Sequence, residues 1–78
     1  TWFSIDAEAQ KNIDKHISNC DFKYKNTDFC FYSHKNVPEA EIGYKEDWIL
    51  KQLGKAKIYH GSWSNRKESL SYQDIFIL

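Results

Sequence analysis

Aromatic side chains make up 17% of this chain, which has only 78 residues. A chain of this length has room for one domain, and it buries roughly 60–65% of the surface that its unfolded form exposes. Because each buried ring removes a large apolar area from water, a few rings give a short chain a working core. The other rings then remain available as a contact surface. We therefore expect residues 1–78 to form one small domain whose rings are divided between these two uses.

Charge and hydropathy exclude several classes of protein. Eleven Lys and Arg residues balance eleven Asp and Glu residues. The two signs are mixed along the chain without a block of one sign, which argues against a polybasic tail. The longest strongly apolar run, residues 75–78, is far shorter than a membrane span. We therefore expect a soluble protein without a membrane partner.

The clearest helix is predicted for residues 5–17. Apolar residues recur there at every fourth position and line one face: Ile5, Ala9, Ile13 and Ile17. Ser4 precedes the apolar pattern and is the expected N-cap, because its hydroxyl can accept a hydrogen bond from a free backbone N–H of the first turn. Asn19 is the expected C-terminal stop of this helix.

A second helix is predicted for residues 45–53, with Gly54 following its last turn. Upstream of it, Asn36 and Glu39 have the spacing of a capping box, which indicates a helix start. Gly43 interrupts that pattern, so the segment from residue 45 is the better helix.

Residues 22–31 contain alternating aromatic positions on either side of a polar turn, which predicts a β-hairpin. With the turn centred on residues 26–27, four rings share one face and pair across the strands: Tyr24 with Phe29, and Phe22 with Phe31. A slip of one residue moves every side chain of a strand to the other face and divides this aromatic group. We therefore predict the first register.

Two further strands are predicted at residues 55–60 and 70–78, separated by a polar loop at residues 61–68. The apolar residues at the end of the last strand run on without alternating, so we expect that end to be buried on both faces. The order of elements is then α-β-β-α-β-β. An antiparallel sheet of about four strands with two helices packed on one face accommodates this order, and the fold class is α+β.

Cys20 and Cys30 are the two cysteines of the chain. In the predicted hairpin register their side chains lie on opposite faces, and no disulfide forms without a movement of the backbone. We therefore expect reduced thiols and a cytoplasmic protein, whereas a Cys20–Cys30 disulfide would indicate secretion. Neither the cysteines nor the three scattered histidines have the spacing of a zinc site. No metal and no cofactor are expected.

The sequence contains no phosphate-binding loop, zinc-protease motif or nucleophile elbow. A metal-free ribonuclease needs a general base, a general acid and a cation for the transition-state phosphate. If the chain were a nuclease, the candidate catalytic residues are His60, Arg66, Glu68 and His34. Because these residue types occur together in many solvated loops, we do not expect an enzyme.

Residues 55–67 also interleave rings with cations, as in proteins that stack bases and neutralise phosphates. The zero net charge argues against nucleic acid, whose binding proteins usually carry a basic excess. Trp, Tyr and Arg also dominate hot spots between proteins. Trp63, between two serines, is the best candidate for an exposed anchor, unless its ring folds back over the core; Trp2 is the next. The candidate binding residues are Trp63, Tyr59, Arg66, Lys67, Lys57 and Tyr32.

These patterns favour a small non-enzymatic interaction protein that binds, and thereby inhibits or regulates, a protein partner. A ribonuclease-type toxin and an RNA-binding module that uses residues 55–67 are the alternatives. We expect a monomer or a homodimer, the latter formed through an edge strand or an exposed aromatic face.

Overall fold

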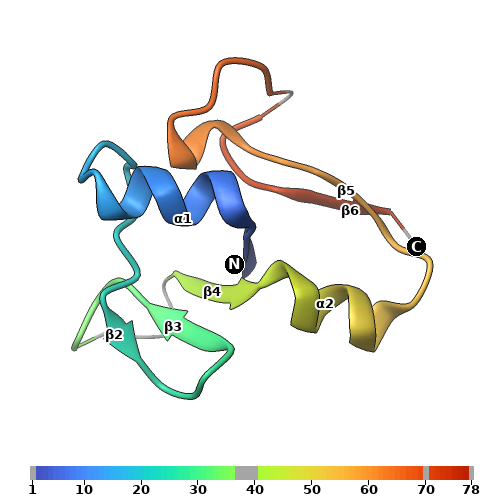
Figure 1. The fold of residues 1–78 in the computed structure, drawn as a ribbon, viewed down its shortest axis with the longest axis horizontal. Helices are drawn as coiled ribbons and strands as arrows, with labels where there is room; N and C mark the ends of the chain where they lie inside the picture. The colour runs from blue at the N-terminus through green and yellow to red at the C-terminus, as the bar shows by residue number, and fades with distance from the viewer. Residues whose placement is uncertain (1, 37–40, 70, 78) are drawn as a thin grey trace.

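The computed structural model describes residues 2–36, 41–69 and 71–77. Within these ranges the chain contains two α-helices, six short strands and one 3₁₀ helix (Figure 1). In chain order the elements are β1 (Trp2–Ile5), α1 (Ala7–Asp14), β2 (Tyr24–Lys25), β3 (Cys30–Tyr32), β4 (Ile42–Lys45), α2 (Glu46–Leu53), β5 (Lys57–Tyr59), the 3₁₀ helix (Ser62–Ser64) and β6 (Ile75–Ile77).

Four strands form one sheet in the order β1-β4-β3-β2. The β2–β3 and β3–β4 pairs are antiparallel, while β1 runs parallel to β4, with Ile5 opposite Lys45. The strands β5 and β6 pair with each other in a second, antiparallel sheet, which Figure 1 shows as a separate ribbon. The predicted α+β class, with two helices and a four-stranded, mostly antiparallel sheet, is confirmed, and the order of elements roughly fits. The strands β1 and β4 are additions to that prediction.

The helix α1 is shorter than predicted and has a different N-cap. Asp6, with an extended backbone, accepts a hydrogen bond from the Ala9 N–H at 2.9 Å. Ser4 was the wrong choice because it belongs to β1 and is buried there. The helix ends at Asp14 with Lys15 as its C-cap, and the next residue, His16, already has a positive φ of 60°. Asn19 therefore does not stop it.

The helix α2 begins directly after β4 and closely matches the predicted range. It ends at Gly54, whose φ of 68° lies in the left-handed region that favours glycine. The other predicted helix start, a capping box between Asn36 and Glu39, involves residues 37–40, which lie outside the described residues. Gly43 does not interrupt a helix, because it lies in β4.

The hairpin forms, but in a different register from the predicted one. Two pairs define it: Tyr24 opposite Tyr32, and Lys25 opposite Phe31. The loop is longer than a two-residue turn, and the N–H groups of both Asn26 and Thr27 donate to the Cys30 carbonyl, at 2.9 and 3.1 Å. The Thr27 hydroxyl also accepts a hydrogen bond from the Phe29 N–H. These local hydrogen bonds stabilise the wider loop and shift the pairing of the strands.

The four rings of the hairpin segment consequently separate. Phe22 lies before β2 with a positive φ of 43° and is buried in the core. Tyr24 stacks on Tyr32, with ring centroids 5.4 Å apart, and Phe29 stacks on Trp48 at 4.6 Å. The prediction that these rings share one face was therefore wrong.

The core lies where β1, α1 and the loop after β5 meet. Three rings pack edge to face or tilted at its centre, with Phe3 5.5 Å from Phe22 and 5.4 Å from Trp63, and Phe22 5.1 Å from Trp63. The complete buried cluster consists of Phe3, Ile5, Ala9, Cys20, Phe22 and Trp63. Gly43 leaves the space that two of these side chains fill, since an added Cβ would lie 2.8 Å from Ile5 and 2.9 Å from Phe22.

The strand β6 is not buried on both faces: Ile75 is 37% and Ile77 50% exposed, because β6 pairs with β5 in a two-stranded sheet.

Cys20 and Cys30 are free and buried, in agreement with the expected reduced thiols. Burial raises the pKa of the Cys20 thiol to about 12, which keeps it in the unreactive protonated form. Neither described helix is long and apolar enough to cross a membrane.

Candidate functional site

Trp63, the predicted exposed anchor, is completely buried in the core. Its ring contacts Phe3 and Phe22, and its Nε1–H donates to the Asp74 carboxylate at 3.1 Å. The alternative prediction, a ring that folds back over the core, is therefore confirmed. The flanking serines are typical of a solvated loop, but Ser64 is itself buried. A buried Trp63 cannot contact a partner, so its role is structural.

Asp74 organises the loop that contains Trp63. Its buried carboxylate accepts hydrogen bonds from the Ser4 N–H at 2.6 Å, the Gly61 N–H at 2.6 Å and the Trp63 indole. A buried carboxylate is tolerated only when such donors satisfy it. These bonds fix residues 61–64 against the edge of β1, which places the preceding residue, His60, beside the ends of β1 and β4.

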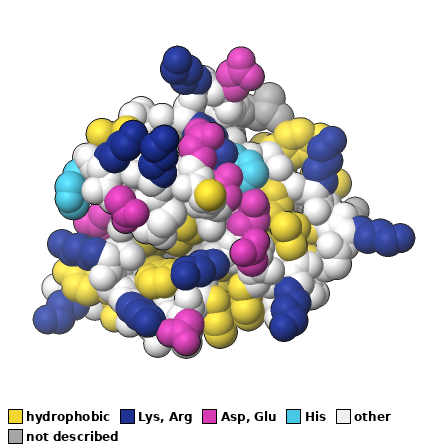
Figure 2. All heavy atoms as spheres, viewed as in Figure 1, with side chains coloured by type: hydrophobic (Ala, Val, Ile, Leu, Met, Phe, Trp, Pro, Cys, Tyr) yellow, Lys and Arg dark blue, Asp and Glu magenta, His cyan; other side chains and the backbone are white. Residues whose placement is uncertain are grey.

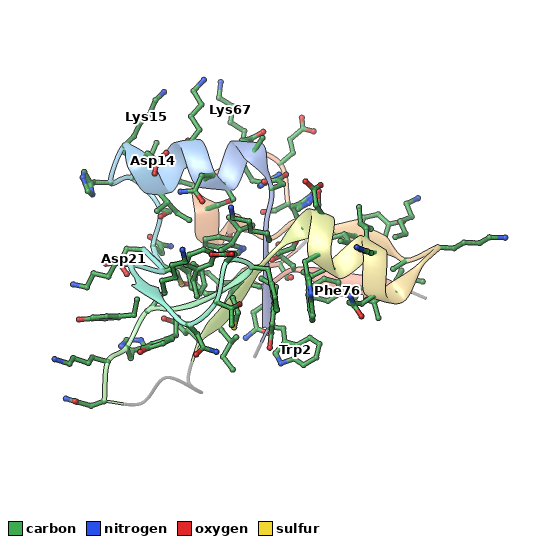
Figure 3. All side chains as sticks on the ribbon, turned by 60° about the horizontal axis from the view of Figure 1, so that its bottom comes forward. Trp2, Asp14, Lys15, Asp21, Lys67 and Phe76 are labelled. Carbon is green, nitrogen blue, oxygen red and sulfur yellow. The ribbon has the colours of Figure 1, made fainter. Side chains whose placement is uncertain are left out.

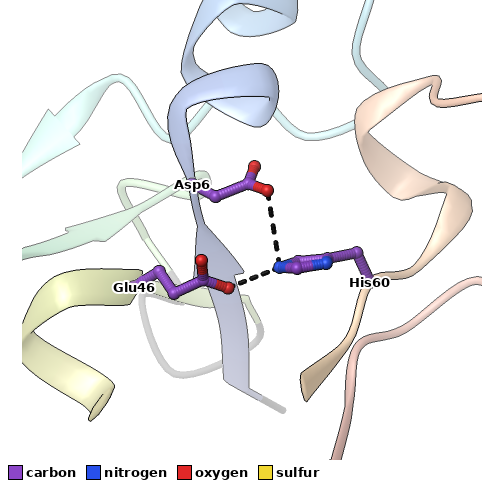
Figure 4. A group of neighbouring side chains, drawn as sticks. All are labelled: Asp6, Glu46 and His60. Atoms are coloured by element: carbon purple, nitrogen blue, oxygen red, sulfur yellow. Dashed lines mark hydrogen bonds and ion pairs between the residues drawn. The ribbon is translucent and has the colours of Figure 1, made fainter. Parts of the chain in front are cut away.

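A polar cluster lies at that edge of the sheet and consists of Asp6, Glu46 and His60 (Figure 4). Because Ile5 is opposite Lys45 in the parallel pair, Asp6 and Glu46 are the next residues at the same edge. The carboxyl ends of parallel strands meet in this way in many binding sites. The His60 Nε2 lies 3.4 Å from Asp6 Oδ2 and is hydrogen-bonded to Glu46 Oε1. All three side chains are largely buried.

Neighbouring groups orient the two carboxylates. Asp6 Oδ1 accepts hydrogen bonds from Arg66 Nη2 at 2.6 Å and from the Ala9 N–H, and the Ser4 hydroxyl donates to Glu46 Oε1 at 3.0 Å. Burial acts to raise the pKa of Asp6, but the hydrogen bonds from Arg66 and Ala9 and the charges of Arg66 and His60 together lower it. Asp6 is therefore held ionised.

The structure brings some of the predicted nuclease residues together and separates one. His60 and Arg66 are joined through Asp6, and Glu68 lines a depression of about 450 Å³ next to His60. His34 is elsewhere: it hydrogen-bonds to Glu41 at 2.9 Å and lines a different depression. Of the two candidate partners for His60, Glu68 is therefore near it and His34 is not.

The predicted binding residues do not form one surface. Lys57 lies over the Tyr59 ring at 5.0 Å on β5, whereas Tyr32 stacks on Tyr24 in the other sheet. Arg66 is bound to Asp6, and Lys67 is exposed. Figure 3 shows Lys67 above α1, on the opposite side of the molecule from Trp2.

A more continuous aromatic feature lies elsewhere, and we call it the aromatic row: Phe29, Trp48, Tyr44 and Trp2. Successive ring centroids are 4.6, 4.9 and 5.3 Å apart along this order. Trp2 is 56% exposed, and the other three rings are partly exposed. Trp48 is therefore only partly buried. The row depends on the pairing of β1 with β4, which no local pattern in the sequence indicates.

An acidic cleft of about 540 Å³ adjoins the cluster. It is lined by Ile5, Asp6, Ala7, Glu8, Gln10, Lys45, Glu46 and Asp47. Figure 2 shows acidic side chains gathered on this face, where the first turns of α1 and α2 approach each other. Asp6 and Glu46 are thus accessible from solvent through the cleft.

We expect Asp6→Asn to lower the free energy of unfolding by about 2 kcal/mol at pH 7, because it leaves the largely buried Arg66 without its ion pair. Asparagine is an equally good N-cap, so the loss of stability is due to the missing charge of the Asp6 carboxylate. The folded-state pKa of Asp6 is lowered, so its contribution is present above its ordinary pKa and is lost as the pH falls through the folded value.

Urea unfolding of the parent and Asp6→Asn proteins at pH 7 and at pH 3 measures the difference between their free energies of unfolding. We expect this difference to be smaller at pH 3. Asp28→Asn is the matched control, because Asp28 also forms an ion pair, with Lys25 at 2.9 Å, but is fully exposed. It should leave the unfolding curve unchanged. A difference for Asp6→Asn that is the same at both pH values would show that the ion pair does not stabilise the fold.

No protein-family model matches this chain, and no solved structure matches it.

Proposed function

We propose that the chain is a small interaction protein that binds a protein partner through the aromatic row and thereby inhibits or regulates that partner. The observation that carries this proposal is the row itself, in which the largely exposed Trp2 continues a stack of three partly exposed rings. Trp and Tyr side chains dominate the energetics of protein interfaces.

The stacking within the row favours a protein over a nucleic acid. Trp48 lies between Phe29 and Tyr44, nearly parallel to both, with interplanar angles of 4° and 14°. Both faces of its indole are therefore occupied, while base stacking needs a free aromatic face. Lys57 lies over one face of the Tyr59 ring. The net charge of zero also supports a partner other than a polyanion.

Preorganisation also supports this function. Three rings of the row, Phe29, Trp48 and Tyr44, are stacked on one another, so these three have little side-chain freedom to lose on binding. Because ordering rotamer-rich side chains opposes association, a fixed row binds more tightly than flexible rings.

Affinity capture tests the proposal. The immobilised chain is incubated with lysate of cells in which it occurs, the retained protein is identified, and the affinity of the purified pair is measured for parent and variant chains. We expect Trp2→Ala to weaken binding by at least about 30-fold, as for a hot-spot tryptophan. Its exposed position allows the variant to fold, which circular dichroism verifies.

Ile17→Ala is the matched control, since Ile17 is an exposed apolar residue, at 46%, after α1. It should change the affinity less than about 3-fold. Equal affinities for the parent and Trp2→Ala chains would refute the aromatic row as the binding surface. Tight, strongly salt-dependent binding to single-stranded RNA in place of a protein would support the nucleic-acid alternative.

A further inference from the structure

The cluster of Asp6, Glu46 and His60 directs three potential ligand atoms of two kinds toward one point. The imidazole Nε2 and one oxygen of each carboxylate all lie within 4.8 Å of one another. Each residue directly follows a strand: Asp6 follows β1, Glu46, the first residue of α2, follows β4, and His60 follows β5. Only the fold brings the three together. We propose that these residues form a binding site for a divalent transition-metal ion.

The donor set suits such an ion. Imidazole nitrogen together with carboxylate oxygen is a common ligand set for Zn²⁺ and neighbouring first-row cations. With metal–ligand distances of about 2.0–2.2 Å, two ligands of a tetrahedral ion are about 3.4 Å apart. The His60 Nε2 to Asp6 Oδ2 distance already has this value, 3.4 Å. His60 Nε2 and Glu46 Oε1 are in direct hydrogen-bond contact, so the Glu46 side chain must move away from the imidazole when an ion binds between them.

The hydrogen-bonding capacity of the histidine also favours an ion. The Nε2 atom carries at most one hydrogen, yet two carboxylate oxygens face it, one from Asp6 and one from Glu46. A single N–H cannot be well aligned with both acceptors. A metal ion in place of that hydrogen binds the nitrogen lone pair and both oxygens together.

The surroundings hold the ligands in position, as outer-sphere groups do at metal sites. Arg66 and the Ala9 N–H occupy Asp6 Oδ1, which leaves Oδ2 directed at His60. The Ser4 hydroxyl orients Glu46. Arg66 offsets one of the two carboxylate charges, while Glu8 and Asp47 in the adjoining cleft add negative potential that attracts a cation.

The site is open and bridges two parts of the fold. Three protein ligands leave at least one coordination position for water or another ligand, and the acidic cleft reaches Asp6 and Glu46 from solvent. Asp6 and Glu46 follow strands of the four-stranded sheet, whereas His60 follows β5 of the two-stranded sheet. A bound ion would therefore connect the two sheets and stabilise the folded chain.

Calorimetric titration of the full chain with Zn²⁺ tests the site. We expect one ion per chain, and at a hundredfold excess of zinc over the dissociation constant we expect the thermal midpoint to rise by at least about 5 °C. His60→Ala should weaken binding by at least about 100-fold, and Ser4→Ala, which removes only the hydrogen bond to Glu46, by about 10-fold. Glu46→Gln, which keeps the size of the side chain, provides a second ligand variant should His60→Ala not fold.

His34→Ala is the matched control because His34 forms a similar but exposed pair with a single carboxylate, Glu41. It should bind Zn²⁺ as the parent does. The absorption of the Co²⁺-loaded chain should lack a thiolate-to-cobalt band, since the buried cysteines are not among the ligands. Absence of stoichiometric binding, unchanged affinity in both ligand variants, or a thiolate band would each overturn the proposal.

Discussion

Replacing Trp63 by alanine is expected to lower the free energy of unfolding by about 4 kcal/mol, which is most of the stability of a domain of this size. The ring fills the centre of the core against Phe3 and Phe22, so its removal leaves a large cavity. The substitution also deprives the buried Asp74 of its indole donor. Circular dichroism and urea unfolding at 25 °C measure the loss.

Trp2→Ala is the matched control, because it deletes the same side chain from an exposed position. It should cost less than about 1 kcal/mol. Trp63→Phe separates the two contributions of Trp63, since phenylalanine keeps apolar packing and removes only the donor and part of the ring; we expect an intermediate loss of about 2 kcal/mol. A folded Trp63→Ala protein with parental stability would contradict the assignment of this ring to the core.

Gly61→Ala is expected to lower the free energy of unfolding by about 3 kcal/mol. The φ of Gly61 is −84°, which any residue can adopt, so the effect is purely steric. An added Cβ would lie 2.2 Å from the Tyr72 carbonyl oxygen and 2.6 Å from the Gln73 carbonyl carbon, both of them backbone atoms. The backbone segments at residues 61 and 72–73 must move apart, which breaks the hydrogen bond from the Gly61 N–H to Asp74.

Gly54→Ala provides the opposite case. Its φ of 68° is strained for alanine, but no atom lies within 4 Å of the added Cβ. Because its ψ of −104° places Gly54 outside the left-handed helical region, the expected loss is about 1–2 kcal/mol from backbone strain alone. Thermal unfolding of the two variants should therefore show a clearly larger decrease in midpoint temperature for Gly61→Ala. Equal decreases in midpoint temperature would mean that the close approach of residues 61 and 72–73 does not persist in solution.

The substitutions at Gly61 and Trp63 affect the polar cluster as well as the stability of the fold. The loop that contains Gly61 and Trp63 is fixed by Asp74 and directly follows His60. A variant that loosens this loop without unfolding the chain should also displace His60 from Asp6 and Glu46. Residual zinc affinity of a folded Trp63→Phe protein thus reports how far the loop positions the proposed site.

Local features of the sequence were sufficient to predict the two helices, the existence of a hairpin and the α+β class. The four-residue apolar spacing before residue 17 and the glycine after residue 53 act within one or two turns of helix, so they do not depend on the rest of the chain. The hairpin register was not predictable in the same way. It depends on hydrogen bonds of Asn26 and Thr27 within a wider loop, which compete with the alternation of rings.

The division of aromatic residues between core and surface was decided by the tertiary structure. The sequence alone determined that 17% of the 78 residues are aromatic. It did not determine which rings are buried, because Trp63 is covered by Phe3, 60 residues away in the sequence, and Trp2 is left exposed next to Tyr44. The same holds for Asp6, Glu46 and His60, which only the parallel pairing of β1 with β4 and the Asp74-bound loop bring together. Periodicity reports the environment of neighbours along the chain, whereas such contacts arise from the pairing of distant strands, and no local pattern encodes that pairing.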